Sequence, residues 1–191
     1  MKTVDVKIPV GLMRRLCCCL FIFISLSLSA QNIPLDNWVF RMNGEKKWLT
    51  AAVPGTVHTD LMRNARIPDP FVEQNETTVG WVGKNDWEYQ SDFTLTDSVL
   101  QLEQIELCFE GLDTYADVYL NDVLLGSSDN MFRSWIYNVK QFVKTENKLK
   151  VRFHAVEPVA TKLANKVSYT LPEGLRCYTR KAQYQYGWDW G

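Results

Sequence analysis

The residues best suited to bind a ligand lie at the end of the 191-residue chain, in the stretch YGWDWG. Trp188 and Trp190 flank Asp189, and in an extended segment the two indoles share one side while the carboxylate points to the other. An indole can cover the apolar C–H face of a sugar ring, and a carboxylate can accept hydrogen bonds from sugar hydroxyl groups. The spacing alone favours sugar binding and a structural role equally, and in the structural role Asp189 caps a turn.

No catalytic apparatus stands out elsewhere in the sequence. His58 lies in a short helix-like stretch and His154 at the end of a strand-like one, and we expect each to be structural or surface-exposed. The sequence has no glycine-rich phosphate loop, no histidine-rich metal pattern and no Gly-x-Ser-x-Gly elbow. None of its carboxylates stands out by spacing as a glycosidase pair. We therefore expect no catalytic residue, no metal and no cofactor in this chain.

The first thirty residues differ in composition from the rest. Basic residues at positions 2, 7, 14 and 15 precede the apolar run LCCCLFIFISLSL and the small residues that end at Ala30. This is the layout of a secretory signal, so we expect cleavage near Ala30 and an exported protein, periplasmic or extracellular. The apolar run is short for a membrane span, and we expect no permanent anchor.

The remaining residues, 31–191, are expected to form one domain. Loss of four basic residues and one acidic residue changes the formal net charge from −1 to −4. Such a chain lacks the clustered lysine and arginine that phosphate binding needs, so we expect no nucleic acid partner. Cys108 and Cys177 remain, and the sequence leaves their pairing open.

Alternating apolar and polar residues predict a mainly β fold. WEYQSDFTL and NKLKVRF each place their large apolar residues on one face, and IELCFEGLD and YADVYLNDVLLG add strands and a turn at Asn121-Asp122. Two short helices are expected, in TVHTDLMRNARIPD with Thr56 as a cap and in EPVATKLANKV. Several short strands with polar turns predict a β-sandwich of the jelly-roll type.

Five stretches in one unbroken order resemble a known family: VPGTVHTDLMRNARIPDPF, WVGKNDWEYQSDFTL, FEGLDTYADVYLND, GSSDNMFRSW and RKAQYQYGWDWG. Together they resemble the amino-terminal, galactose-binding-domain-like domain of β-mannosidases of glycoside hydrolase family 2. The resemblance covers about residues 37 to 191. DPF and the terminal GWDWG favour β-mannosidases over other members of that family, such as β-galactosidases and exo-β-glucosaminidases.

The resemblance implies a role for each residue of the last stretch. Trp188 would form a wall of the pocket for a terminal mannose, and Asp189 would accept hydrogen bonds from its hydroxyl groups. Gly187 and Trp190 would shape the loop. Arg180 would either orient it by pairing with an acidic residue or be solvated, as would the neighbouring Lys181.

The resemblance also implies what this chain lacks. The family continues into the last strands of the sandwich, a second domain and a catalytic barrel that carries the acid/base and nucleophile glutamates. We expect a sandwich that is incomplete at its carboxyl end and inactive alone, from an enzyme that releases terminal β-D-mannose from glycans or oligosaccharides with retention. The alternatives are a free-standing carbohydrate-binding module, another enzyme of the family, or a structural sandwich without a ligand.

Overall fold

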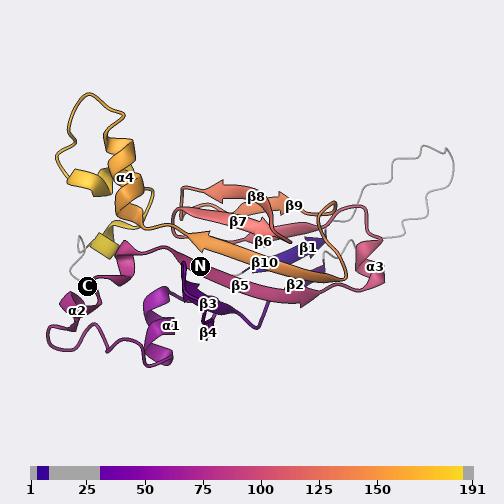
Figure 1. The fold of residues 1–191 in the computed structure, drawn as a ribbon. Helices are drawn as coiled ribbons and strands as arrows, with labels where there is room; N and C mark the ends of the chain where they lie inside the picture. The colour runs from indigo at the N-terminus through magenta and orange to yellow at the C-terminus, as the bar shows by residue number, and fades with distance from the viewer. Residues whose placement is uncertain (1–3, 9–30, 187–191) are drawn as a thin grey trace, which may run out of the picture.

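Two antiparallel sheets form the body of the protein, in a computed structural model that describes residues 4–8 and 31–186 (Figure 1). The smaller sheet has the order β2-β1-β6-β9 and the larger one β4-β3-β5-β10-β7-β8. The strands of the smaller sheet are β1 (Val4–Ile8), β2 (Gln31–Pro34), β6 (Glu106–Phe109) and β9 (Trp135–Asn138). Those of the larger sheet are β3 (Val39–Met42), β4 (Leu49–Thr50), β5 (Trp87–Thr94), β7 (Ala116–Leu120), β8 (Val123–Ser128) and β10 (Glu146–Phe153). The predicted mainly β sandwich is confirmed.

The core lies between the sheets and follows the alternation seen in the sequence. β5 and β10 pair over eight residues, from Glu146 opposite Thr94 to Phe153 opposite Trp87. Successive side chains of a strand point to opposite faces, so alternate residues of these strands enter the core. Leu149 and Val151 are fully buried there, and from the other sheet Leu107 and Phe109 are too.

The turn predicted at Asn121-Asp122 joins β7 and β8. Both residues have positive φ, 51° and 65°. A two-residue hairpin turn whose twist matches that of the flanking strands requires positive φ at both positions. Asn and Asp tolerate this region better than most residues, which explains why this dipeptide marks the turn.

Short helices gather at the two ends of the sandwich (Figure 1). The two expected helices are present as α1 (Val57–Arg63) and α4 (Val156–Ala164). The other helical segments are α2 (Asn75–Val79), η1 (Val82–Lys84), α3 (Asp97–Leu100), η2 (Gly174–Tyr178) and η3 (Gln183–Tyr186). α1, α2 and α4 lie at one end and α3 at the other (Figure 1). Within the described residues, we find no helix with the length and apolarity needed to cross a bilayer.

β1 belongs to the segment expected to be a secretory signal. It pairs on one side with β2 and on the other with β6, both antiparallel. Val4 and Val6 are buried in the core between the sheets. Residues near the amino terminus therefore form an inner strand of the smaller sheet.

Candidate functional site

Most of the predicted sugar-binding residues lie outside the described residues. Gly187, Trp188, Asp189 and Trp190 belong to this group, and their placement stays a prediction. The residues immediately before them form η3, the last helical segment described. η3 ends at Tyr186, which is the first residue of the YGWDWG stretch.

η3 borders a pocket at the helical end of the sandwich. This pocket has a volume of about 840 Å³, and Gln185 and Tyr186 are part of its wall. Its other walls come from the start of β5, the end of β10, α1, η1, α4 and η2. The predicted binding residues thus follow directly after a residue of the pocket wall.

Aromatic rings form the floor of the pocket. Trp87 and Tyr89 come from β5 and Phe153 from β10, all with alternate spacing that turns them to one face. The Tyr89 and Phe153 rings meet edge to face with centroids 5.8 Å apart, and Trp81 packs on Trp87 at 5.9 Å. Trp87 also donates its indole N–H to the Val82 carbonyl at 2.9 Å. These contacts hold the rings in fixed orientations.

The segment that leads to YGWDWG is fastened to the sandwich by polar contacts. Lys181 Nζ lies 2.5 Å from Asp113 Oδ2, and both residues line the pocket. Tyr115 donates its hydroxyl to the Tyr178 carbonyl at 3.2 Å. The Thr179 hydroxyl lies 2.9 Å from the Tyr186 hydroxyl, which ties the two ends of the segment together.

Arg180 contributes through its backbone. Its carbonyl accepts a hydrogen bond from Met131 N at 3.0 Å, next to a parallel bridge between Asn130 and Arg180. Its side chain is exposed. Of the two basic residues in this stretch, Lys181 makes the ion pair that positions the segment.

α1 forms another wall, and its start is specified by the sequence. Thr56 accepts a hydrogen bond from Thr59 N at 3.2 Å, and Thr59 Oγ1 accepts one from Thr56 N at 3.1 Å. This reciprocal arrangement satisfies two backbone donors that the first turn leaves without partners. Gly55 precedes it, and a Cβ there would lie 2.3 Å from the Ala52 carbonyl oxygen. The turn into α1 therefore requires glycine.

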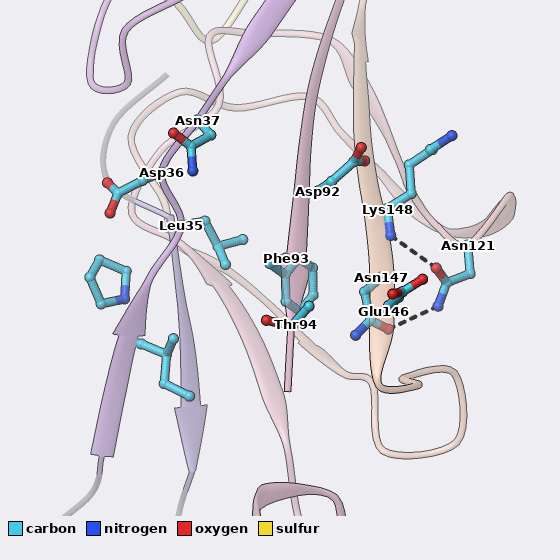
Figure 2. Close-up of a pocket in the computed structure, with 12 residues that line it drawn as sticks. Leu35, Asp36, Asn37, Asp92, Phe93, Thr94, Asn121, Glu146, Asn147 and Lys148 are labelled. Atoms are coloured by element: carbon cyan, nitrogen blue, oxygen red, sulfur yellow. Dashed lines mark hydrogen bonds between the residues drawn. The ribbon is translucent and has the colours of Figure 1, made fainter. Parts of the chain in front are cut away.

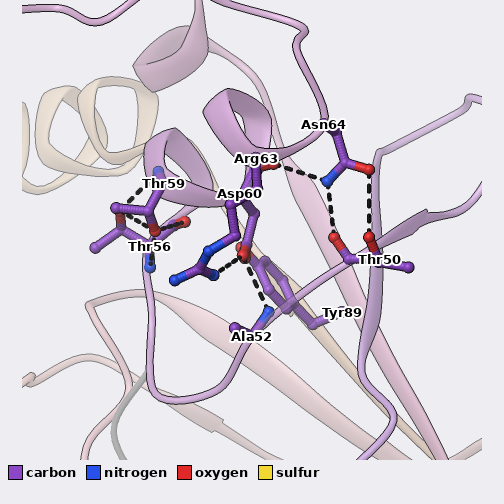
Figure 3. Close-up of polar contacts among 8 residues, drawn as sticks. All are labelled: Thr50, Ala52, Thr56, Thr59, Asp60, Arg63, Asn64 and Tyr89. Atoms are coloured by element: carbon purple, nitrogen blue, oxygen red, sulfur yellow. Dashed lines mark hydrogen bonds and ion pairs between the residues drawn. The ribbon is translucent and has the colours of Figure 1, made fainter.

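A buried carboxylate connects α1 to the pocket floor (Figure 3). Asp60 is fully buried, and its Oδ1 accepts hydrogen bonds from Ala52 N at 3.0 Å and Arg63 Nη1 at 2.9 Å. Its Oδ2 accepts the Tyr89 hydroxyl at 2.9 Å. Burial, together with the nearby Asp60 charge, raises the pKa of Tyr89, so this hydroxyl stays protonated and donates. The network fixes Tyr89 in the floor.

His154 also lines the pocket. Its Nδ1 lies 3.2 Å from Asp86 Oδ2 and its Nε2 lies 2.9 Å from Asp117 Oδ2. Arg152 Nη2 also contacts Asp86 Oδ2, at 2.9 Å, and Ala155 N donates to Asp86 Oδ1 at 2.9 Å. Partial burial alone would raise the pKa of Asp86, but the hydrogen bonds from Ala155, Arg152 and His154 outweigh it and lower that pKa. The histidine is structural, as the sequence suggested.

His58 lies at the pocket wall on α1. Partial burial lowers the pKa of its imidazole, which favours the neutral form at pH 7. A neutral imidazole both donates and accepts hydrogen bonds.

Within residues 4–8 and 31–186, no three histidine, cysteine or carboxylate side chains lie where they could hold a metal ion. The described walls therefore combine an aromatic floor with hydrogen-bonding groups, a composition suited to a polyhydroxylated ligand.

A second hollow, of about 590 Å³, lies at the other end of β5 and β10 (Figure 2). Three of its polar residues, Asn121, Asn147 and Lys148, are hydrogen-bonded to one another. Asn121 Nδ2 donates to Asn147 Oδ1 at 3.0 Å, and Lys148 N donates to Asn121 Oδ1 at 3.0 Å. These bonds stabilise the β7–β8 turn, and we do not regard this hollow as the functional site.

Comparison with known proteins identifies the domain that carries this pocket. Residues 38–191 match the family described as glycosyl hydrolase 2 galactose-binding domain-like. The chain belongs to this family. The matched residues include all elements around the pocket and the YGWDWG stretch. The resemblance seen in the sequence motifs is thus confirmed.

Individual members of the glycosyl hydrolase 2 family extend the comparison. A beta-mannosidase from Capra hircus is 33% identical over 166 residues, which cover 81% of this chain and 19% of that protein. Beta-mannosidase B from Thermothelomyces thermophilus is 38% identical over 169 residues, or 83% and 20%. The crystal structure of the beta-D-mannosidase from Dictyoglomus thermophilum superposes with a TM-score of 0.78 at 45% identity, covering 82% of this chain and 20% of that one. This chain therefore spans about a fifth of the length of these relatives.

Sequence reasoning named Lys181 but missed its partner Asp113, and it missed the pairing of Tyr89 with Asp60. Asp113 and Lys181 are 68 residues apart, and Tyr89 and Asp60 are 29 apart. Nothing in the local pattern pairs them. The one signal was that each of the four residues lies in one of the quoted family stretches, which are FEGLDTYADVYLND, RKAQYQYGWDWG, VPGTVHTDLMRNARIPDPF and WVGKNDWEYQSDFTL.

Proposed function

We propose that this chain is the amino-terminal substrate-pocket domain of an exo-acting β-mannosidase, which hydrolyses terminal non-reducing β-D-mannose residues with retention. The observation that carries the proposal is that η3 borders the aromatic pocket immediately before Gly187. The names of the relatives, all beta-mannosidases, support mannose as the sugar.

In this proposal the chain grips the sugar and leaves bond cleavage to another part of the enzyme. Trp188 covers the apolar face of mannose, and Asp189 accepts hydrogen bonds from its hydroxyl groups. The Lys181–Asp113 ion pair holds the preceding segment, while Trp87, Tyr89 and Phe153 support it from the floor. Gly187 and Trp190 give the loop its shape, and Arg180 anchors it through its backbone carbonyl.

The chain alone is expected to bind mannose weakly and to hydrolyse nothing. A single carboxylate and a few rings bury too little of a sugar to offset the entropy of association. Retaining hydrolysis needs two carboxylates about 5–5.5 Å apart, and the resemblance assigns those to a region beyond this chain. Glycans and oligosaccharides with terminal mannose are thus substrates of the whole enzyme, and the protein is exported to reach them.

A domain exchange tests the proposal. Residues 31–191 of this chain would replace the matching fifth of the Dictyoglomus thermophilum beta-D-mannosidase, and the hybrid would be assayed on aryl β-mannoside, β-galactoside and β-glucosaminide. We expect the hybrid to hydrolyse the mannoside. Asp189→Ala should reduce kcat/KM by about 100-fold or more, because hydrogen bonds to a charged group contribute about 1.5–3 kcal/mol each.

Matched controls separate the possible outcomes. Asp92→Ala, in the hollow at the far end of β5, should leave kcat/KM unchanged. Full activity of the Asp189→Ala hybrid would contradict the proposed sugar contact, and turnover by the isolated chain would show that no other domain is needed. Binding of mannose by the isolated chain well below millimolar, lost in Asp189→Ala, would instead support a free-standing carbohydrate-binding module.

A further inference from the structure

His58 differs from the other polar side chains that line the aromatic pocket. Its imidazole is half-buried, and within residues 4–8 and 31–186 it has no hydrogen-bond partner. Glu157 and Gln185 are exposed to solvent. Most of the remaining polar side chains bond to protein groups, among them Thr56, Asn85, Tyr89, Asp113, His154 and Lys181. The imidazole is therefore available to a ligand in a way that these neighbours are not.

The backbone that carries His58 is held on both sides (Figure 3). Before it, Thr56 and Thr59 form the reciprocal cap of α1. After it, the buried Asp60 accepts the Tyr89 hydroxyl in the pocket floor at 2.9 Å. A side chain on such a fixed element loses less conformational freedom when it binds a ligand than one on a loose loop. α1 thus presents the imidazole to the pocket at a defined place.

The chemistry of this imidazole suits an uncharged hydroxyl group. Partial burial lowers the pKa of His58, so the ring is neutral at pH 7. A neutral ring offers one N–H donor and one acceptor nitrogen, and a hydroxyl group can both donate and accept. Buried polar groups are nearly always hydrogen-bonded, so a ligand that satisfies the ring nitrogens gains from the contact.

The surroundings of His58 connect it to the predicted binding stretch. The same pocket is lined by Tyr186, which directly precedes Gly187, and by the apolar rings of Trp87 and Phe153. Hydrogen bonds are stronger beside apolar walls than in open water. A sugar held by the residues after Tyr186 would therefore enter the pocket that His58 lines.

We propose that His58 determines sugar specificity by a hydrogen bond to one hydroxyl group of the sugar bound in the aromatic pocket. The inference rests on the proposed function, because it takes the occupant of the pocket to be a sugar. Recognition is then shared between α1 and the stretch with Trp188 and Asp189, which are distant in the sequence. The sequence alone suggested a structural or surface role for this histidine.

Substitutions in the hybrid enzyme that contains residues 31–191 of this chain test the contact. His58→Leu removes both hydrogen-bonding nitrogens, whereas His58→Gln keeps one donor and one acceptor group. On the aryl β-mannoside, kcat/KM should fall about tenfold in the leucine variant and less than about threefold in the glutamine variant. An unchanged kcat/KM in His58→Leu would overturn the proposal.

Substrates that each lack one hydroxyl group separate recognition from a structural role. A structural defect in His58→Leu would lower kcat/KM by the same factor for every monodeoxy β-mannoside. A direct contact predicts one exception, because the substrate without the contacted hydroxyl group has no hydrogen bond to lose. For that substrate, His58→Leu and the unsubstituted hybrid should have equal kcat/KM. The same loss on all substrates would contradict the contact.

NMR spectroscopy of the imidazole nitrogens gives a second readout in the full 191-residue chain, which has only two histidines. An excess of D-mannose should shift the resonances of His58 and leave those of His154, whose ring nitrogens contact Asp86 and Asp117. His58→Gln assigns the signals, and L-mannose, the mirror image, controls for solvent effects. Unmoved His58 signals, or equal shifts with L-mannose, would overturn the proposal.

The two readouts also distinguish this inference from the proposed function. An unsubstituted hybrid that hydrolyses no β-mannoside would contradict the proposed function, and the imidazole resonances of the full chain would still decide whether His58 contacts the sugar. An active hybrid that His58→Leu leaves unchanged would overturn the role of His58 alone.

Discussion

Lys181 donates to Asp113 across 2.5 Å, and this ion pair fastens the segment leading into YGWDWG to the loop between β6 and β7. The two side chains are 18% and 25% exposed, so water screens the pair only partly. The pair links two family stretches that are far apart in the sequence. Its main role is to position the segment, since a pair of this exposure contributes little to global stability.

Lys181→Met should loosen the segment while leaving the fold intact. The free energy of unfolding is expected to fall by about 1 kcal/mol or less. Amide exchange at Met131 and Gln185, whose N–H groups bond to the Arg180 and Ala182 carbonyls, should become several-fold faster. Hydrogen exchange with mass spectrometry measures this. Lys162→Met, on the exposed side of α4, is the control and should change neither rate; equal exchange in both variants would contradict the positioning role.

Tyr89→Phe should destabilise the domain by about 1–3 kcal/mol, because Asp60 would lose one of the donors that satisfy its buried carboxylate. Asp60→Ala should cost more, about 3–5 kcal/mol, since it removes the charge that Arg63 and Ala52 N also contact. Urea unfolding measures both. Tyr119→Phe, on the face where Lys150 covers the ring, is the matched control and should change stability by less than about 0.5 kcal/mol.

Acidification should weaken the domain through Asp86 and Asp117. Hydrogen bonds to each carboxylate, from His154 among others, outweigh partial burial and lower its pKa. Carboxyl groups with a lowered folded pKa stabilise the fold above their unfolded pKa of about 3.9, and this contribution is lost as the pH falls through the folded pKa. Unfolding free energies measured from pH 7 to about pH 2 should therefore fall below about pH 4.

The matched variant for this pH effect is the double substitution Asp86→Asn and Asp117→Asn. It should be less stable than the wild type at pH 7 and should approach it as the pH falls below about 4, because the wild type then loses the same charges. Parallel curves for the two proteins over the whole range would show that these carboxylates do not carry the acid sensitivity.

Gly55→Ala should displace the start of α1, because the new Cβ would meet the Ala52 carbonyl oxygen at 2.3 Å. A backbone shift of this kind typically costs about 1–3 kcal/mol. Gly83→Ala is the control at the same pocket, since a Cβ there has no neighbour within 4 Å. Thermal unfolding should separate the two variants, and equal midpoints would show that the turn into α1 has room to adjust.

The local sequence pattern predicted the fold well where apolar and polar residues alternate clearly and where turn or capping residues mark the ends of elements. The strands β5 and β10, the Asn121-Asp122 turn and the Thr56 cap of α1 all follow from residue types at fixed spacings, whereas the pairing of β5 with β10 is seen only in the structure. β1 could not be predicted, because its basic and apolar surroundings indicate a leader and its strand character depends on partners far along the chain. α2 and α3 are one-turn helices whose sequences carry no clear period.

The candidate site was predicted less completely. Arg180 and Lys181 were recognised as neighbours of the binding stretch, but only the folded chain shows that Lys181 makes the ion pair and that Arg180 acts through its carbonyl. Trp188 and Asp189 rest on the sequence resemblance. Contacts between segments so far apart depend on topology, and a single sequence contains no direct record of it.

The long β5–β10 ladder also has a practical use for biophysical work on this protein. Lys148 lies opposite Asp92, and the rise of about 3.4 Å per residue along β5 places it roughly 17 Å from the aromatic floor around Trp87. A dye attached through Lys148→Cys would sit at the remote rim beside Asn121 (Figure 2). That separation suits short-range energy transfer from a fluorescent glycan. Binding of the glycan could then be followed in real time without a change to the residues that line the aromatic pocket.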